Sequence, residues 1–183
     1  MRLRHADAGR DAAGCAAIYE PFVSQAAVSF EERPPTAADF VARIQRIERT
    51  HPWLVAEEGE CLAGYAYACP HRERAAYRWA AEVALYVDPA FRRRGVGSAL
   101  YRALLELLKE QGVWVVFAGV TLPNEASVGL HESLGFTPVG TYRRIGYKLG
   151  RWWDVAWWQL ALREPGDGPP AEPGPPARLA DPR

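Results

Sequence analysis

Residues 86–108 read YVDPAFRRRGVGSALYRALLELL, and this stretch decides the fold. A strand-like apolar run ends at Asp88-Pro89, a loop of three arginines and two glycines follows, and a leucine-rich segment comes directly after the loop. The leucines recur with helical spacing, which predicts an amphipathic helix over residues 97–111. This short segment therefore predicts a strand, a basic glycine-containing loop and a helix, in that order.

The composition is that of one globular domain. The chain has 183 residues, of which 49% are apolar and 24% charged, and its formal net charge is zero. A general nucleic-acid binder carries a basic excess, so we expect no nucleic-acid partner. The N-terminus shows no export signal and no apolar run approaches a bilayer span, so we expect a cytoplasmic protein without a membrane partner.

The three cysteines are Cys15, Cys61 and Cys69. Their odd number and irregular spacing do not fit a disulfide framework or a metal site. We therefore expect reduced thiols that act as small buried hydrophobes, and no bound metal.

The end of the chain differs from the rest. From residue 164 the sequence reads EPGDGPPAEPGPPARLADPR, with seven of the fifteen prolines. Such a segment buries too little apolar surface to offset its ordering entropy. We expect one domain over residues 1–163 and a disordered tail over 164–183, with a proline-rich docking ligand as the alternative.

The remaining elements alternate between strands and helices. Helices are predicted over 11–19, from the Thr36 cap onward, over 97–111 and over 124–134. Strands are predicted at LRHA, on both sides of a turn near Glu58-Gly59, at AAEVALYV, at VWVVFAGV, and at TPVGTYRRIGY and DVAWWQLAL. The order β-α-α-β-β-β-α-β-α-β-β predicts a mixed α/β fold with helices packed on a mostly antiparallel sheet.

The glycine loop has the chemistry of an anion cradle. The first turn of a helix offers free N–H groups and the positive end of the helix dipole. Glycines let the backbone approach an anion, and arginines add bidentate donors, so the loop suits a diphosphate. The Rossmann and Walker patterns are absent. The alternative is a basic turn before a helix that starts with glycine.

Two motifs together resemble the GNAT acetyltransferase superfamily. The first is the Arg-x-x-Gly-x-Gly of its coenzyme A pyrophosphate loop, and the second is an asparagine, a small residue three later and a Gly-Phe pair; the matching residues are Arg92, Gly95, Gly97, Asn124, Ser127, Gly135 and Phe136. Five separated segments, among them HPWLVAEEGECLAGYAYACP and GRWWDVAWWQL, further resemble phosphinothricin and methionine sulfoximine N-acetyltransferases. The resemblance covers roughly residues 1–163 and implies the splayed sheet of the GNAT fold.

The resemblance implies acetyl-CoA as co-substrate. The residues that would bind its pyrophosphate are Arg92, Arg93, Arg94, Gly95, Val96, Gly97 and Ser98. Its pantetheine arm would add to the strand edge formed by Leu85, Tyr86 and Val87. Asn124 would face the thiol end, and as a residue before a helix it also suits a plain N-cap.

Two residues are predicted to take part in proton transfer. The resemblance implies a glutamate base at Glu82, which shares a strand face with Ala84 and Tyr86; the alternative is an exposed carboxylate paired with an arginine. His131 stands where many GNAT enzymes have a tyrosine that protonates the leaving thiolate. It would relay a proton or bind substrate. It also suits an ordinary helical histidine, in which case solvent protonates the thiolate.

The substrate implied by the resemblance is a small anionic amino acid. Its anion would meet the arginine forks of Arg72 and Arg74, with Tyr77 close by. Phe30 and Tyr101 match aromatic residues of the family's substrate pocket. Relatives of this type are homodimers, so we expect one here.

Two other functions stay open on the sequence. One is acetylation of a peptide N-terminus or a polyamine by the same fold, although the arginines disfavour a polyamine. The other is a coenzyme A-binding module without turnover, which the presence of Glu82 disfavours.

Overall fold

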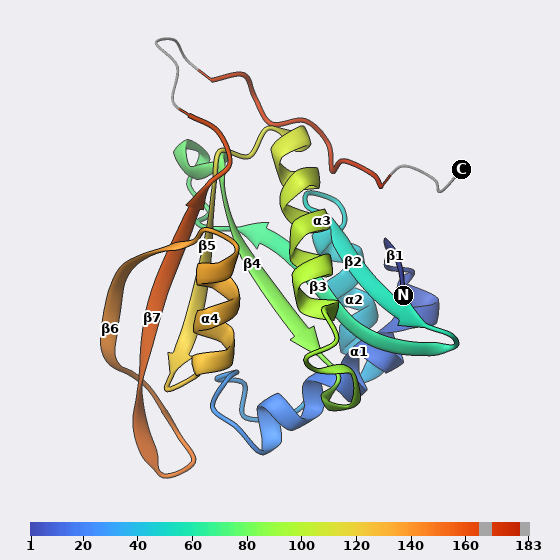
Figure 1. Ribbon diagram of the computed structural model, residues 1–183, viewed down its shortest axis with the longest axis vertical. Helices are drawn as coiled ribbons and strands as arrows, with labels where there is room; N and C mark the ends of the chain where they lie inside the picture. Colours follow the sequence, from blue (N-terminus) through green and yellow to red (C-terminus); the bar gives the residue numbers. More distant parts are fainter. Residues whose placement is uncertain (165–169, 180–183) are drawn as a thin grey trace.

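The computed structural model describes residues 1–164 and 170–179, built on one seven-stranded sheet (Figure 1). The strands are β1 (Arg2–His5), β2 (Trp53–Glu58), β3 (Cys61–Pro70), β4 (Ala80–Val87), β5 (Val115–Leu122), β6 (Thr137–Lys148) and β7 (Arg151–Ala161). The helices are α1 (Ala8–Ser24), α2 (Ala37–Ile47), α3 (Val96–Gln111) and α4 (Glu125–Ser133), with short 3₁₀ turns η1 (Ala75–Tyr77) and η2 (Pro89–Phe91).

The sheet order is β1-β2-β3-β4-β5-β7-β6. The β4–β5 pair is parallel, because α3 carries the chain across one face between them, and the other pairs are antiparallel. This confirms the predicted mixed, mostly antiparallel α/β architecture.

Helices cover both faces of the sheet. Figure 1 shows α3 and α4 in front of the strands and α1 and α2 behind them. The side-chain alternation of β2 separates the two cores: Trp53 and Val55 pack toward α1 and α2, whereas Leu54 and Ala56 pack toward α3. All four of these side chains are fully buried.

The start of α2 follows the predicted signal, whereas α1 begins earlier and ends later than predicted. Thr36 and Asp39 form a complete capping box at the start of α2. Helix α1 is longer than the predicted 11–19, because the Asp7 side chain accepts the Arg10 N–H and the helix continues through Pro21. Burial of Val23 in the last turn, at 1% exposure, favours the continuation that proline opposes locally.

The expectation of three buried cysteines is wrong in part. Cys15 is buried on the sheet-facing side of α1, but Cys61 is exposed and Cys69 is half-buried. Cys61 begins β3 directly after the β2–β3 turn, at the end of the hairpin, where its side chain is exposed. The exposure of Cys61 depends on where the turn lies, and the number and spacing of the cysteines do not predict that position.

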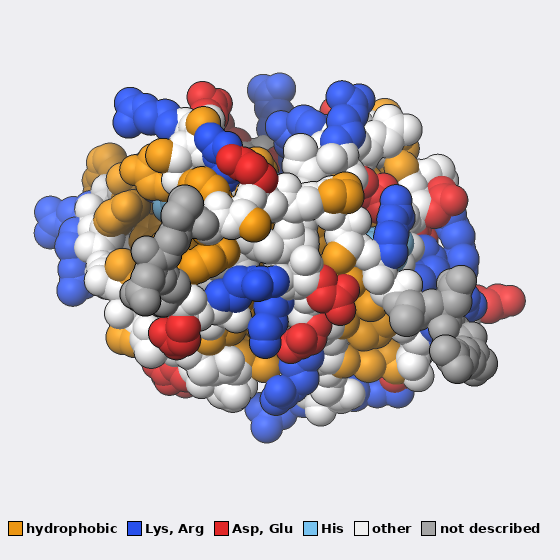
Figure 2. Space-filling model, turned by 90° about the horizontal axis from the view of Figure 1, so that it is seen from above, with side chains coloured by type: hydrophobic (Ala, Val, Ile, Leu, Met, Phe, Trp, Pro, Cys, Tyr) orange, Lys and Arg blue, Asp and Glu red, His pale blue; other side chains and the backbone are white. Residues whose placement is uncertain are grey.

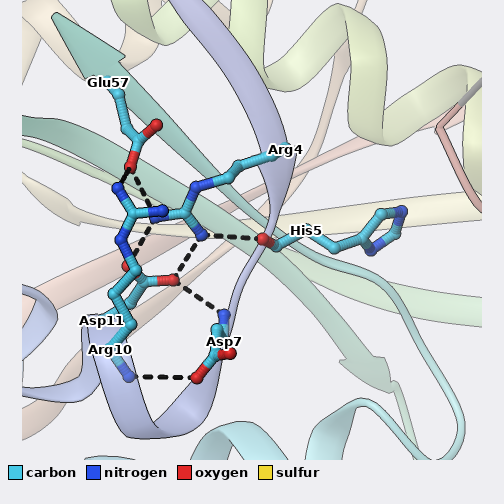
Figure 3. A network of polar contacts seen from close by, with 6 residues as sticks. All are labelled: Arg4, His5, Asp7, Arg10, Asp11 and Glu57. Carbon is cyan, nitrogen blue, oxygen red and sulfur yellow. Dashed lines mark hydrogen bonds and ion pairs between the residues drawn. The ribbon is translucent and has the colours of Figure 1, made fainter. Parts of the chain in front are cut away.

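An ion cluster fixes the start of the chain to the sheet (Figure 3). The Arg4 guanidinium donates to both oxygens of Asp11 at 2.6 Å and to Glu57 at 2.6 Å, and Arg10 donates to the same Glu57 oxygen. Burial opposes charge on Asp11, but the hydrogen bonds from Arg4 and from the Asp7 N–H outweigh it, so the pKa of Asp11 lies below its usual value. The cluster therefore joins β1, α1 and β2.

Part of the proline-rich segment lies against the domain. Residues 170–179 form no helix or strand, but the Trp79 indole donates to the Ala171 carbonyl, Gly174 N–H to the Gln111 carbonyl, and Leu179 N–H to His5. The side chain of Leu179 also packs against the α3-side core. Residues 165–169 and 180–183 lie outside the described residues, so disorder there, and the boundary after residue 163, stay predictions.

The surface carries mixed charge. Figure 2 shows acidic and basic side chains interspersed over the face seen from above, in keeping with the zero net charge of the chain. Within residues 1–164 and 170–179, no helix has the length and apolar character required to cross a membrane.

Candidate active site

The sheet opens next to Glu82. Strand β4 pairs with β3 as far as Val87, but it pairs with β5 only from Ala80 to Glu82. Beyond Glu82 the two parallel strands separate, which leaves the β5-facing edge of residues 83–87 without a partner strand. This edge includes the predicted pantetheine-binding positions.

Side chains of this edge alternate between the two cores. Leu85 and Val87 pack toward α3, whereas Tyr86 lies under α1 with its ring centroid 4.8 Å from that of Tyr19. These side chains thus pack against the cores on the two faces of the sheet. What the edge offers to a ligand is its backbone N–H and C=O groups.

The start of α3 has the geometry of an anion cradle. Gly95 is the N-cap with φ of 82°, a left-handed conformation that glycine adopts without strain. No side chain among the described residues caps this helix end, and Ala99 N–H makes the first helical bond, to the Gly95 carbonyl. The amides of the first turn are therefore available to a ligand.

Gly97 has a different role. A Cβ placed there would lie 3.0 Å from Cδ2 of Leu85 and 3.4 Å from Cδ2 of Leu130. The glycine thus lets the first turn of α3 pack closely against both β4 and α4. Val96, at 1% exposure, anchors the same turn in the core, while Ser98 is half-buried.

The three loop arginines are exposed at the rim of the cradle. The Arg92 guanidinium lies 5.5 Å from the centre of the Phe22 ring, and Arg94 pairs with Glu58. Arg93 has φ of 59°, which turns the chain sharply before the helix. The arginines thus surround the free amides with positive charge.

Asn124 begins α4 next to this region. Its side-chain oxygen accepts the Ser127 N–H at 3.1 Å, so it is the N-cap of the helix. The amide nitrogen of Asn124 is not used in the cap. The sequence left cap and ligand roles open, and the observed geometry accommodates both.

A pocket of about 250 Å³ lies beside Glu82. It is lined from β3, β4, β5, β7 and the α1–α2 loop by Val28, Phe30, Tyr67, Cys69, Glu82, Val83, Ala84, Gly119, Thr121, Val155 and Trp157. Its wall is mostly apolar, and Glu82 is the one acidic side chain among the described residues that line it. A larger hollow of about 420 Å³ on the β6–β7 hairpin contains no predicted site residue, so we place the candidate site at Glu82.

The hairpin holds Phe30 in this pocket. The ring lies so close to Gly146 of β6 that a Cβ there would be 2.3 Å from it. The Lys148 ammonium donates to the carbonyl of the adjacent Ser29 at 2.7 Å. The long α1–α2 loop is therefore fixed by contacts with β6.

The predicted substrate residues are not all brought together. Arg72 donates to Glu82 at 3.2 Å, and the Tyr77 ring lies edge-on to His71 next to it. Arg74 is exposed at the start of η1 and makes no contact with Glu82. The pairing of Glu82 with an arginine, an alternative on the sequence, is thus present at the pocket itself.

Tyr101 and His131 lie in the core and do not line the pocket; they are 2% and 4% exposed. His131 Nδ1 lies 2.7 Å from the Ser127 carbonyl, which only accepts, so Nδ1 carries the hydrogen. In the neutral ring Nε2 then accepts the Tyr101 hydroxyl at 3.2 Å. Burial lowers the pKa of His131, which favours this neutral form, although its bond to Ser127 acts in the opposite direction.

Sequence reasoning predicted only Phe30 and Glu82 among the pocket-lining residues, and three of the residues that it missed matter most for Glu82. His71 bonds Glu82, Trp157 forms one wall, and Cys69 lies opposite Glu82 in the β3–β4 register. Burial, reinforced by the Glu82 charge, raises the pKa of Cys69 to about 11, so this cysteine is a neutral thiol. The segment PHRER signalled His71 only weakly, and nothing local signalled Trp157.

Comparison with known proteins decides the family. The model of the acetyltransferase (GNAT) family matches residues 15–136. The chain belongs to this family. It is therefore an acetyltransferase by family, and the predicted GNAT fold and enzyme class are confirmed.

Several GNAT relatives resemble the chain over nearly its whole length. It is 40% identical to a phosphinothricin N-acetyltransferase of Streptomyces viridochromogenes, over 94% of each chain. It is 33% identical to the L-methionine sulfoximine/L-methionine sulfone acetyltransferase of Salmonella typhimurium, over 90% of this chain and 96% of that one. The structure of a phosphinothricin acetyltransferase from Sinorhizobium meliloti in complex with acetyl-CoA superposes with a TM-score of 0.88, at 34% identity and 93% coverage of both.

Proposed function

We propose that this GNAT protein transfers an acetyl group from acetyl-CoA to the α-amino group of a small anionic amino acid of the phosphinothricin or methionine sulfoximine type. The observation that carries the proposal is the position of Glu82. It is the last β4 residue paired with β5, and its carboxylate lines a pocket where the strands separate. The names of the similar proteins support the substrate class.

The chain's own groups fit acetyl-CoA. The uncapped start of α3, with left-handed Gly95 and a rim of arginines, suits the pyrophosphate. The unpaired edge of residues 83–87 suits the amide groups of the pantetheine arm. Asn124 lies at the start of the neighbouring helix α4, and its side-chain NH2 is not used in the cap. Acetyl-CoA supplies an activated acetyl thioester when bound.

Glu82 acts as the base. An amino acid carries an ammonium group at neutral pH, and nitrogen attacks only after losing a proton. The Glu82 side chain is 30% exposed, open enough to meet the amine and partly shielded from water. It accepts the proton from the ammonium, a role that contributes about 10²–10⁴-fold to the rate.

The surrounding residues hold the amino acid. Arg72 donates to Glu82, and Arg74 is exposed at the start of η1 nearby in the chain. Their guanidinium groups bind the anionic part of the substrate in bidentate fashion. Phe30 packs against its carbon chain. These contacts place the amine beside Glu82 and the thioester.

A relay role for His131 requires its neighbour. Both ring nitrogens are bonded inside the protein, to the Ser127 carbonyl and the Tyr101 hydroxyl. The neutral ring carries its hydrogen on Nδ1, so His131 donates only after Nε2 is protonated; that Nε2 proton would then pass to the Tyr101 oxygen as the tyrosine gives up its own. If Tyr101→Phe retains the wild-type rate, His131 is not the general acid and the thiolate takes its proton from solvent.

The test is an amine panel. Purified protein is mixed with acetyl-CoA and with phosphinothricin, methionine sulfoximine or each ordinary amino acid, and release of free coenzyme A is measured. We expect turnover with the glutamate-like analogues and a loss of about 10²–10⁴-fold in Glu82→Gln. Glu110→Gln, an exposed carboxylate at the far end of α3, is the matched control and keeps the wild-type rate. No release with any amine refutes the proposal.

The same experiment separates the alternatives. Acetyl-CoA binding in calorimetry without turnover indicates a coenzyme A-binding module. Faster acetylation of a peptide N-terminus than of free amino acids indicates the peptide alternative. The compact, mostly apolar pocket beside Glu82 favours a small substrate.

We further propose a cytoplasmic homodimer. The family resemblance suggests the dimer, and the β6–β7 hairpin exposes apolar side chains, among them Tyr147, Trp152 and Leu149 at 57–59%. Three free thiols suit the reducing cytoplasm. Light scattering after gel filtration should give twice the mass of the chain, and a monomer with full activity contradicts the dimer.

A further inference from the structure

His71 is held rigidly beside Glu82. It follows β3, and its N–H bonds the Ala80 carbonyl at 3.3 Å. Its ring is stacked on Phe117 with centroids 4.4 Å apart and planes at 20°. The rings of Trp157 and Tyr77 meet it edge-on at 6.1 Å. The side chain is only 14% exposed, so the surrounding rings fix its direction.

The fixed ring is aimed at Glu82. His71 Nδ1 lies 3.0 Å from Glu82 Oε1. An ionised carboxylate has only lone pairs, so the hydrogen of this bond belongs to Nδ1. Arg72 Nη1 donates to the same oxygen at 3.2 Å. Both donors thus meet on Oε1, and Oε2 has no hydrogen-bond partner within the described part of the chain.

The two donors differ in rigidity. The Arg72 side chain is 47% exposed, and exposed ion pairs of this kind contribute little and rearrange easily. It also donates to the His71 carbonyl, so its position depends on the same segment. Arg72 can turn toward an anionic substrate, whereas His71 cannot leave its aromatic surroundings.

We propose that His71 is a positioning residue for Glu82, whose Nδ1–H fixes Oε1 and thereby presents Oε2 to the substrate amine. The inference rests on the proposed function. In the step that it serves, one N–H bond of the ammonium breaks and an Oε2–H bond forms. The electron pair stays on nitrogen for attack, Glu82 becomes neutral, and His71 keeps its proton. The benefit is geometric, because a small misplacement of a catalytic group costs up to about 10²-fold.

Two variants separate hydrogen bonding from packing. His71→Phe keeps the stack on Phe117 and removes the donor, whereas His71→Asn removes the ring and retains an amide donor close to the position of Nδ1. We expect His71→Phe to lower kcat by about 10–100-fold with the KM for acetyl-CoA unchanged, and His71→Asn to recover most of the loss. In a Glu82→Gln background, His71→Phe should add no further loss.

Two kinetic outcomes overturn the inference. One is a His71→Phe enzyme within about twofold of wild type. The other is equal impairment of both variants, which assigns the effect to packing. If Glu82→Gln abolishes turnover while His71→Phe keeps the wild-type rate, the proposed function is supported and the proposed role of His71 is wrong.

A readout without turnover makes the two failures distinguishable. Nitrogen-15 NMR of the folded protein reports which ring nitrogen of His71 carries hydrogen, and this requires no substrate. We expect hydrogen on Nδ1 in the wild type and a changed Nδ1 signal in Glu82→Gln. A wild-type ring without hydrogen on Nδ1 overturns the role of His71 even if no amine is acetylated.

Discussion

His51 makes the stability of this fold sensitive to acid. The side chain is 8% exposed, and its Nδ1 lies 3.0 Å from the Thr50 hydroxyl. Burial lowers the pKa of His51 from its ordinary 6.5 to about 4. Between pH 6.5 and about 4, His51 is protonated in the unfolded chain but neutral in the folded chain. The free energy of unfolding is therefore fully retained above pH 6.5 and falls as the pH drops toward 4.

The magnitude follows from the two pKa values. Each difference of 1 in pKa corresponds to about 1.4 kcal/mol, so His51 lowers the unfolding free energy by about 3 kcal/mol once both states are protonated. Most of this, about 2–3 kcal/mol, is lost by about pH 4.5. Such a loss is a large part of the stability of an ordinary domain.

The assay compares wild type with His51→Asn, whose side chain can still meet Thr50 but does not titrate. Urea unfolding is measured at about pH 7 and about pH 4.5. We expect the wild type to lose about 2–3 kcal/mol more than His51→Asn over this interval, because carboxylates titrate alike in both proteins. Gln45→Ala, an exposed neutral change in α2, should keep the wild-type pH dependence. Equal losses in wild type and His51→Asn refute the reasoning.

Three further predictions concern the loop, the pocket and the tail. Gly95→Ala forces a left-handed alanine and should lower the unfolding free energy by about 1–2 kcal/mol and weaken acetyl-CoA binding in calorimetry; unchanged affinity contradicts the cradle. Gly146→Ala should displace Phe30 and raise the KM for the amine several-fold without changing that for acetyl-CoA; an unchanged amine KM removes Phe30 from the substrate wall. A chain ending at Glu164 should keep its circular dichroism spectrum but lose about 1–2 kcal/mol of unfolding free energy in urea, because Leu179 no longer packs against the core; a molten chain contradicts the domain boundary.

The sequence alone determined several local elements, including those of the proposed cofactor site. The leucine spacing gave α3, the capping box gave the start of α2, and Gly95 marked the left-handed turn before the cradle. These features depend on neighbours within a few residues, where side-chain periodicity and backbone sterics act directly. The family motifs lie in the same segments, and so the family was predictable from them.

Only the tertiary structure decided how distant segments meet at the pocket. Strand register brings Cys69 opposite Glu82, and it ends the β4–β5 pairing at Glu82 itself. The same long-range packing places His71 against Phe117 and seats Tyr101 in the core, away from the pocket. Contacts between residues far apart in the chain depend on which faces of the sheet are covered and where neighbouring strands separate. No periodicity within a single segment encodes those two properties.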